Sequence, residues 1–99
     1  MVHSLWGRAD ETYGECPVLT SMTAAAFVSG LKGNASDRFI AASAACKHLA
    51  VYAGPDDTRH TFDAKVSQRD LVGTFLPAYE ACARAGGLGY MCRCGSVGS

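Results

Sequence analysis

The sequence lacks an excess of charge of either sign, because nine Lys and Arg balance nine Asp and Glu. Modules that bind nucleic acid or an anionic membrane surface need excess positive charge, so this balance argues against both. Long hydrophobic runs are also missing: apolar stretches such as residues 24–28 are far shorter than the roughly 20 residues of a membrane span. No basic segment followed by an apolar run marks a signal peptide. We therefore expect neither nucleic acid nor a membrane as a partner.

The sequence is also short, with 99 residues, whereas a complete (β/α)8 barrel takes about 250. This length suffices for one small domain. A hydrophobic fraction of 48% with 18% charged residues favours a packed core over general disorder.

An odd number of cysteines, five in all, excludes a full set of intrachain disulfides. Cys92 and Cys94 form the only close pair, and a structural zinc site usually offers two such pairs. His48 and His60 could complete a ligand set, but their spacing does not favour it. We expect buried or incidental thiols and no metal. A thiol or metal module on Cys92 and Cys94 is the minor alternative, which stoichiometric zinc in a purified sample would establish.

A first helix is expected after a non-periodic loop over residues 1–17, from about residue 19 or 20 to residue 31. Thr20 or Ser21 can cap its first amides, and Gly33 can terminate it. Four apolar residues at helical spacing predict its buried face: Met22, Ala26, Phe27 and Leu31.

A buried strand is predicted over residues 39–46, because this run is almost entirely small or apolar. A turn is predicted within residues 53–61, where Gly, Pro and two Asp occupy positions 54–57. A second helix should begin at Ser67, with Asp70 completing a capping box, and Pro77 should kink or divide it. One apolar face is marked along this helix: Leu71, Phe75, Ala78 or Tyr79, and Cys82.

The chain ends with a turn, a strand and a tail. Gly86 and Gly87 should end the second helix, residues 88–92 form a short apolar strand, and residues 95–99 should fray. The resulting order of loop, helix, strand, helix and strand predicts a parallel α/β fold.

The motifs resemble one enzyme family along nearly the whole chain. Residues 6–17 read WGRADETYGECP, similar to the W-G-R-x-x-E-T-x-G-E-D-P stretch in the N-terminal barrel domain of glycoside hydrolase family 3. Further blocks continue in family order: FVSGLKG at 27–33, ACKHL at 45–49, RHTFDAKV at 59–66, TFLP at 74–77 and MC at 91–92. The similarity covers about residues 6–95 and is greatest to the β-xylosidase-like branch.

The resemblance implies a fragment of a (β/α)8 barrel, with about two consecutive βα units plus one following strand. Residues 1–99 would then be part of one N-terminal barrel domain. The family hydrolyses glycosides with retention, by a carboxylate nucleophile and an acid/base group. The resemblance places that nucleophile on a later strand, in a motif like S-D-W, and the acid/base group in a further region. We therefore expect no catalytic residue in this chain.

The resemblance implies that three residues contact sugar hydroxyls: Arg8, Lys47 and His48. The planar guanidinium of Arg8 suits hydroxyl oxygens. Adjacent residues of a regular strand face opposite sides, so Lys47 and His48 can enter one site only if the strand is distorted. We therefore expect an irregular peptide at or next to this pair.

Supporting roles fall to residues in the same matched blocks. Glu11 should orient Arg8 or its loop, and Asp63 should cap or brace the second helix. Glu11 and Glu15 are four residues apart, but neither occupies the family's nucleophile position, so we do not expect them to be a catalytic pair. Arg59 and Met91 are also expected to support the site.

The sequence departs from the family pattern in three of the matched blocks. Cys16 replaces an Asp, and Leu49 replaces an aromatic residue after the Lys-His pair. In the M-C-S-Y-N block, Arg93, Cys94 and Gly95 replace Ser, Tyr and Asn. The family Tyr resembles an active-site wall residue, so Cys94 would contact substrate without offering a ring or a phenolic hydroxyl.

The implied reaction is hydrolysis of a β-linked sugar, with xylose favoured, from the non-reducing end of a small saccharide. No metal or organic cofactor is implied. We expect the isolated chain to be inactive, and the family resemblance favours an extracellular location. The alternatives are a non-catalytic sugar-binding remnant and an unstable truncated product. The downstream coding sequence would discriminate best, because an in-frame S-D-W-like block would mark the middle of an enzyme.

Overall fold

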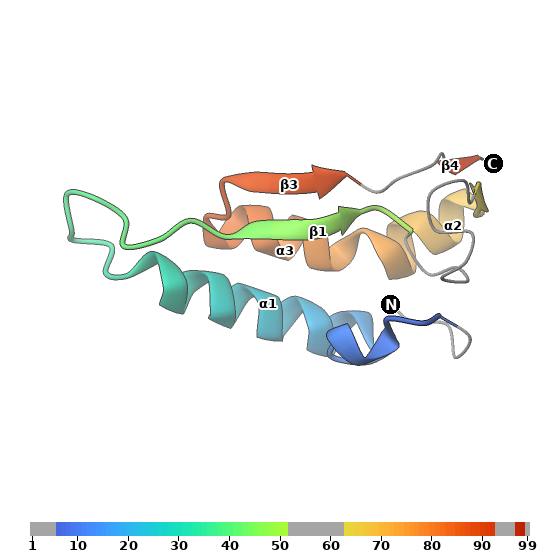
Figure 1. Cartoon of the computed structure of the whole chain (residues 1–99), viewed down its shortest axis with the longest axis horizontal. Helices are drawn as coiled ribbons and strands as arrows, with labels where there is room; N and C mark the ends of the chain where they lie inside the picture. The colour runs from blue at the N-terminus through green and yellow to red at the C-terminus, as the bar shows by residue number, and fades with distance from the viewer. Residues whose placement is uncertain (1–5, 52–62, 93–96, 99) are drawn as a thin grey trace.

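A computed structural model describes residues 6–51, 63–92 and 97–98 of the chain. Arg59, Cys94 and the turn expected at residues 54–57 lie outside the described residues. Within them, helical segments lie before β1 (Ala45–Leu49) and between β2 (Ala64–Lys65) and β3 (Gly89–Cys92), and β1 pairs in parallel with β3. The helices α1 (Pro17–Lys32) and α3 (Pro77–Ala85) run along this pair and pack against each other (Figure 1). The fold is therefore α/β, as the sequence predicted.

The first helix starts earlier than predicted. Cys16 is its N-cap, with a sulfur that accepts a hydrogen bond from the Leu19 amide at 3.4 Å, and Pro17 occupies the first helical position. Proline is well suited there, because its missing N–H has no intrahelical partner to lose. Thr20 and Ser21 are not caps: Ser21 lies inside the helix and donates to the Pro17 carbonyl at 2.6 Å.

The predicted buried face of α1 is wrong. Met22 and Phe27 are 69% and 60% exposed, whereas Val28 is buried. The inward row is Thr20, Ala24 and Val28, which also has helical spacing. Because α1 packs directly on α3, this row rather than the predicted one faces inward, although the exposed Phe27 also borders the cavity.

The first strand is also displaced from its predicted position. β1 begins at Ala45, and Phe39 is 75% exposed instead of buried in a strand. The partner strand β3 explains this displacement. Pairing begins with Ala45 opposite Gly89, so the apolar residues before Ala45 have no described strand alongside them. An apolar run becomes a strand only where another backbone satisfies its amides and carbonyls.

The second helical region is divided, as predicted at Pro77. Ser67 caps α2 (Gln68–Asp70) by accepting from the Asp70 amide at 3.1 Å. A π-helical turn, η3 (Leu71–Phe75), follows, and Pro77 then begins α3. Gly86 ends α3 in the left-handed conformation, with φ of 100°, which confirms the predicted terminator.

Two predictions for the cysteines and the tail are corrected by the structure. Cys46 and Cys82 form a disulfide that joins β1 to α3, so they are not incidental thiols. Part of the tail is ordered rather than frayed, because β4 (Val97–Gly98) pairs in parallel with β2 (Ala64–Lys65). Paired backbone groups hold this short segment in place despite its small residues.

Candidate functional site

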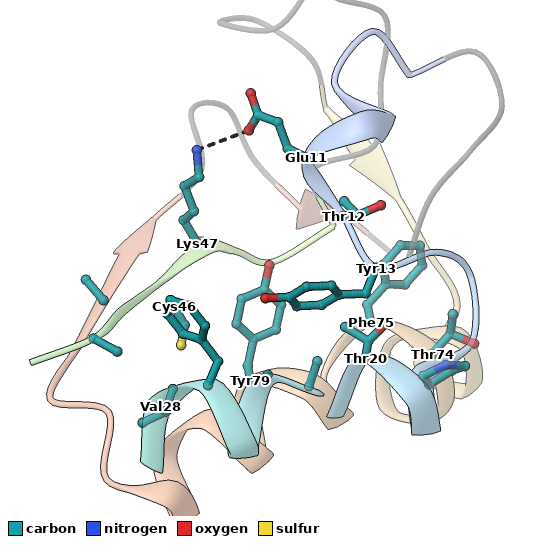
Figure 2. Close-up of a pocket in the computed structure, with 16 residues that line it drawn as sticks. Glu11, Thr12, Tyr13, Thr20, Val28, Cys46, Lys47, Thr74, Phe75 and Tyr79 are labelled. Atoms are coloured by element: carbon teal, nitrogen blue, oxygen red, sulfur yellow. Dashed lines mark hydrogen bonds and ion pairs between the residues drawn. The ribbon is translucent and has the colours of Figure 1, made fainter. Parts of the chain in front are cut away.

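Charged side chains from two distant segments meet beside β1. The 3-10 helix η1 (Ala9–Glu11) carries Glu11, and Arg8 precedes it. Lys47 and His48 lie near the carboxyl end of β1. The Lys47 ammonium contacts a Glu11 carboxylate oxygen at 3.1 Å (Figure 2). The structure thus brings together the three predicted sugar contacts and the predicted supporting Glu11.

The backbone of β1 is irregular at the Lys-His pair, as predicted. The peptide bonds between Lys47 and His48 and between Leu49 and Ala50 are both cis. The pairing with β3 shifts register between Lys47 and Leu49. The strand therefore departs from regular geometry at the residues expected to enter one site.

The electrostatics of the cluster set the ionisation of its members. The hydrogen bond from Lys47 lowers the pKa of Glu11, with smaller contributions from the charges of Lys47, Arg8 and His48. Partial burial lowers the pKa of His48, and the positive charges of Lys47 and Arg8 lower it further. Near neutral pH the site therefore offers two cations, one carboxylate and a neutral imidazole, which together can donate to and accept from sugar hydroxyls.

A cavity of about 370 Å³ lies next to this cluster. Glu11 and Lys47 form part of its wall, and Tyr13, Phe75 and Tyr79 contribute aromatic rings (Figure 2). An apolar hollow with a few polar groups at its edge is the usual form of a small-molecule site.

Of the predicted site residues that the structure describes, only Glu11 and Lys47 line this cavity, and Arg8 and His48 do not. Asp63 is exposed just before β2, and Met91 is exposed in β3 opposite Lys47. Neither residue lines the cavity. Arg59 and Cys94 lie outside the described residues.

Sequence reasoning did not assign a role in the site to Tyr79, which it placed only on an apolar helix face. The Tyr79 hydroxyl donates to the His48 carbonyl at 2.6 Å. The available signal was the residue type, because a buried tyrosine hydroxyl usually requires a hydrogen-bond partner.

Within the described ranges, no group of three or more His, Cys, Asp or Glu side chains is arranged to hold a metal ion. Among the same residues, no helix combines the length and the apolar character needed to cross a membrane.

No model of a known protein family matches the chain. It is 44% identical over 80 residues to xylan 1,4-β-xylosidase of Xylanibacter ruminicola, a match covering 80% of this chain and 9% of the relative. It is 39% identical over 97 residues to probable β-D-xylosidase 7 of Arabidopsis thaliana, covering 88% of this chain and 13% of the relative.

Solved structures show the same similarity. A β-glucosidase from Listeria innocua in complex with glucose matches with a TM-score of 0.79 and 34% identity, over 93% of this chain and 13% of that protein. A glycoside hydrolase family 3 exo-β-xylosidase in complex with a xylobiose aziridine probe matches with a TM-score of 0.86 and 27% identity. That match covers 96% of this chain and 13% of the xylosidase.

In sequence and fold the chain resembles part of a glycoside hydrolase. More narrowly, it resembles a fragment of a glycoside hydrolase family 3 enzyme, and the two curated relatives are named as β-xylosidases. The chain spans 9% and 13% of the length of those two relatives.

Proposed function

We propose that this chain supplies sugar-positioning residues of a retaining, exo-acting glycoside hydrolase that acts on a small β-linked xyloside or glucoside. The observation that carries the proposal is the meeting of Arg8, Glu11, Lys47 and His48 next to a cavity that Glu11 and Lys47 line. Arg8, Lys47 and His48 hold sugar hydroxyls, and Glu11 orients Lys47 through their ion pair. Cys94 is proposed to contact the sugar, and Arg59, Asp63 and Met91 to support the site.

The barrel assignment is part of the same proposal. β1 and β3 would be neighbouring strands of a (β/α)8 barrel, with α1 and α3 in its outer layer and residues 1–99 within its N-terminal domain. Their parallel pairing and the similarity to family 3 structures support this arrangement. The Lys-His pair then lies near the carboxyl end of its strand, where barrel enzymes build their active sites.

Xylose is the favoured sugar. The relatives named as β-xylosidases share 44% and 39% identity with the chain, and the exo-β-xylosidase structure has a TM-score of 0.86. We also propose an extracellular location, which the Cys46–Cys82 disulfide supports because disulfides persist in oxidising compartments.

We expect the isolated chain to bind sugar without hydrolysing it. Retaining hydrolysis requires two carboxyl groups placed about 5–5.5 Å apart across the scissile bond. Glu11 is engaged with Lys47, and the family resemblance gives neither catalytic role to this segment. Sustained release of chromophore from a chromogenic β-xyloside, with contaminating enzyme excluded, would overturn this expectation.

Binding is tested by titrating the isotope-labelled chain with methyl β-xyloside and following its amide resonances. Saturable shifts at residues 8, 11, 47 and 48 are expected, and Lys47→Ala should abolish them. Lys65→Ala is the matched control, because it removes an exposed lysine from β2, outside the cavity lining. Absence of saturable shifts in a folded wild-type chain, or equal loss in both variants, would contradict the proposal.

An unstable truncated product is the second candidate, and the exposed apolar side chains favour it. Val18, Met22, Phe27 and Leu88 are each at least 60% exposed. Exposed apolar surface of this kind contributes little to folding. A broad, non-cooperative thermal transition would support this candidate, whereas a sharp transition would exclude it.

A further inference from the structure

Two connections join α3 to β1, one on either side of Lys47. The residue before Lys47 is Cys46, which is bonded to Cys82 of α3. The residue after it is His48, whose carbonyl accepts a hydrogen bond from Tyr79 of α3 at 2.6 Å. Tyr79 and Cys82 are three positions apart, so they occupy the same face of the helix.

The Lys47 side chain is not part of these connections, because it extends from β1 toward Glu11 rather than toward α3. Figure 2 shows Lys47 extending from β1 toward Glu11, while Cys46 and the ring of Tyr79 lie on the helix side of the strand. The backbone on both sides of Lys47 is therefore attached to α3, and its ammonium reaches Glu11 at 3.1 Å.

We propose that Tyr79 is a positioning residue for the sugar-binding pair. Its hydroxyl and the Cys46–Cys82 disulfide hold the β1 backbone against α3 and so fix the directions of Lys47 and His48. The inference rests on the proposed function for the identity of the ligand. The backbone restraint itself can be measured without any sugar.

The environment of Tyr79 suits this role. Burial raises the pKa of its hydroxyl to about 12, so the proton needed for donation is retained throughout the neutral range. A second tyrosine hydroxyl, that of Tyr90 on β3, donates to the Tyr79 carbonyl at 2.7 Å and not to β1. Removing the Tyr79 hydroxyl would remove the hydrogen bond to the His48 carbonyl while leaving the ring to fill its place.

The test compares Tyr79→Phe with Tyr90→Phe. Each variant removes one hydroxyl that donates to a backbone carbonyl, but only the first releases β1 next to Lys47. The readouts are the melting temperature, the amide and imidazole resonances of His48, and affinity for methyl β-xyloside. The His48 imidazole is an apt probe because Arg8, Lys47 and Glu11 all act on its ionisation.

We expect Tyr79→Phe to displace the His48 resonances and to weaken xyloside binding about three- to tenfold, as for loss of one positioning hydrogen bond. Tyr90→Phe should lower the melting temperature by a similar amount and leave the His48 resonances in place. Unchanged His48 resonances in Tyr79→Phe, or equal displacement in both variants, would overturn the proposal.

The disulfide provides an independent variant if Tyr79→Phe fails to fold. Replacing both Cys46 and Cys82 with Ser removes the second connection and leaves the tyrosine hydroxyl in place. Displaced His48 resonances in the folded fraction support the proposal, and unchanged resonances contradict it. A wild-type chain that binds no xyloside would refute the proposed function alone, since the His48 resonances still test the restraint.

Discussion

At the scale of single residues, the Lys47–Glu11 ion pair joins two segments of the candidate site and adds little to the stability of the fold. The two side chains are 48% and 44% exposed, and ion pairs in such positions contribute about 0–1 kcal/mol. Their contact joins η1 to β1 across 36 positions of sequence. The same exposure leaves both groups accessible to an incoming sugar hydroxyl.

Thr20 has a buried polar atom without a partner. Its hydroxyl oxygen makes no hydrogen bond in the structure, although the residue lies beside the cavity. We predict that Thr20→Val stabilises the chain by about 1 kcal/mol, because a methyl group of similar size removes the cost of an unsatisfied hydroxyl. Thermal unfolding measures the effect, and Thr23→Val is the control, since that hydroxyl donates to the Leu19 carbonyl at 2.8 Å. A lower melting temperature for Thr20→Val would show that its hydroxyl is satisfied in solution.

His48 should make stability depend on pH. Its pKa in the folded chain lies below the ordinary value of 6.5, through burial and then the charges of Lys47 and Arg8. Between these two values the unfolded chain binds more protons, so stability rises with pH and is lost as pH falls below about 6.5. Urea unfolding at several pH values should show this slope, and His48→Gln should reduce it. If the pH dependence of stability is unchanged in His48→Gln, groups other than His48 cause it.

At the scale of elements, the confirmed predictions of helix boundaries are those with a local cause. Ser67 caps α2, Pro77 starts α3, and Gly86 ends it, because each effect depends on backbone geometry within one turn. Two of the signals that failed depended on distant partners, whereas the predicted Thr20 or Ser21 cap failed locally because the helix already begins at Pro17. The start of β1 is set by β3, and the inward face of α1 is set by α3.

Gly86 illustrates an element boundary that a side chain would disturb. Its φ of 100° is strained for other residues, and a Cβ there would lie 2.8 Å from the Lys32 ammonium nitrogen. We predict that Gly86→Ala destabilises the chain by about 1 kcal/mol or more. Chemical denaturation measures the loss. Gly73→Ala is the control, because nothing lies within 4 Å of the added Cβ in that position, and an equal loss in both would remove the conformational explanation.

At the scale of the whole molecule, the disulfide ties together a chain with little buried core. In the described ranges the buried hydrophobic residues are Val28, Val51, Ala64 and Cys82. The bridge joins positions separated by 36 residues. The loop that it closes contains most of β1, then β2, α2 and η3, and most of α3. A covalent link of this span limits the unfolded chain far more than it limits the folded one.

We predict that reduction of the Cys46–Cys82 disulfide lowers the free energy of unfolding by about 3–4 kcal/mol, from the entropy of closing a loop of this length. Unfolding in the presence and absence of a dithiol reductant measures the change. The Cys46→Ser, Cys82→Ser double variant should match the reduced wild type and be insensitive to the reductant. If the reductant still lowers the free energy of unfolding of the double variant, the effect does not come from the Cys46–Cys82 disulfide.

The sequence by itself determined the α/β order, the helix terminators and the similarity to glycoside hydrolase family 3, because these depend on local backbone preferences and on motifs read in order. The motifs also predicted Arg8, Glu11, Lys47 and His48 as site residues, and the structure brings these four residues together. Only the tertiary structure decided that Cys46 meets Cys82, that Tyr79 donates to the His48 carbonyl and that α1 turns Val28 inward. Each of these outcomes depends on which distant segment lies alongside, and packing, unlike backbone preference, is not encoded within a short window of sequence.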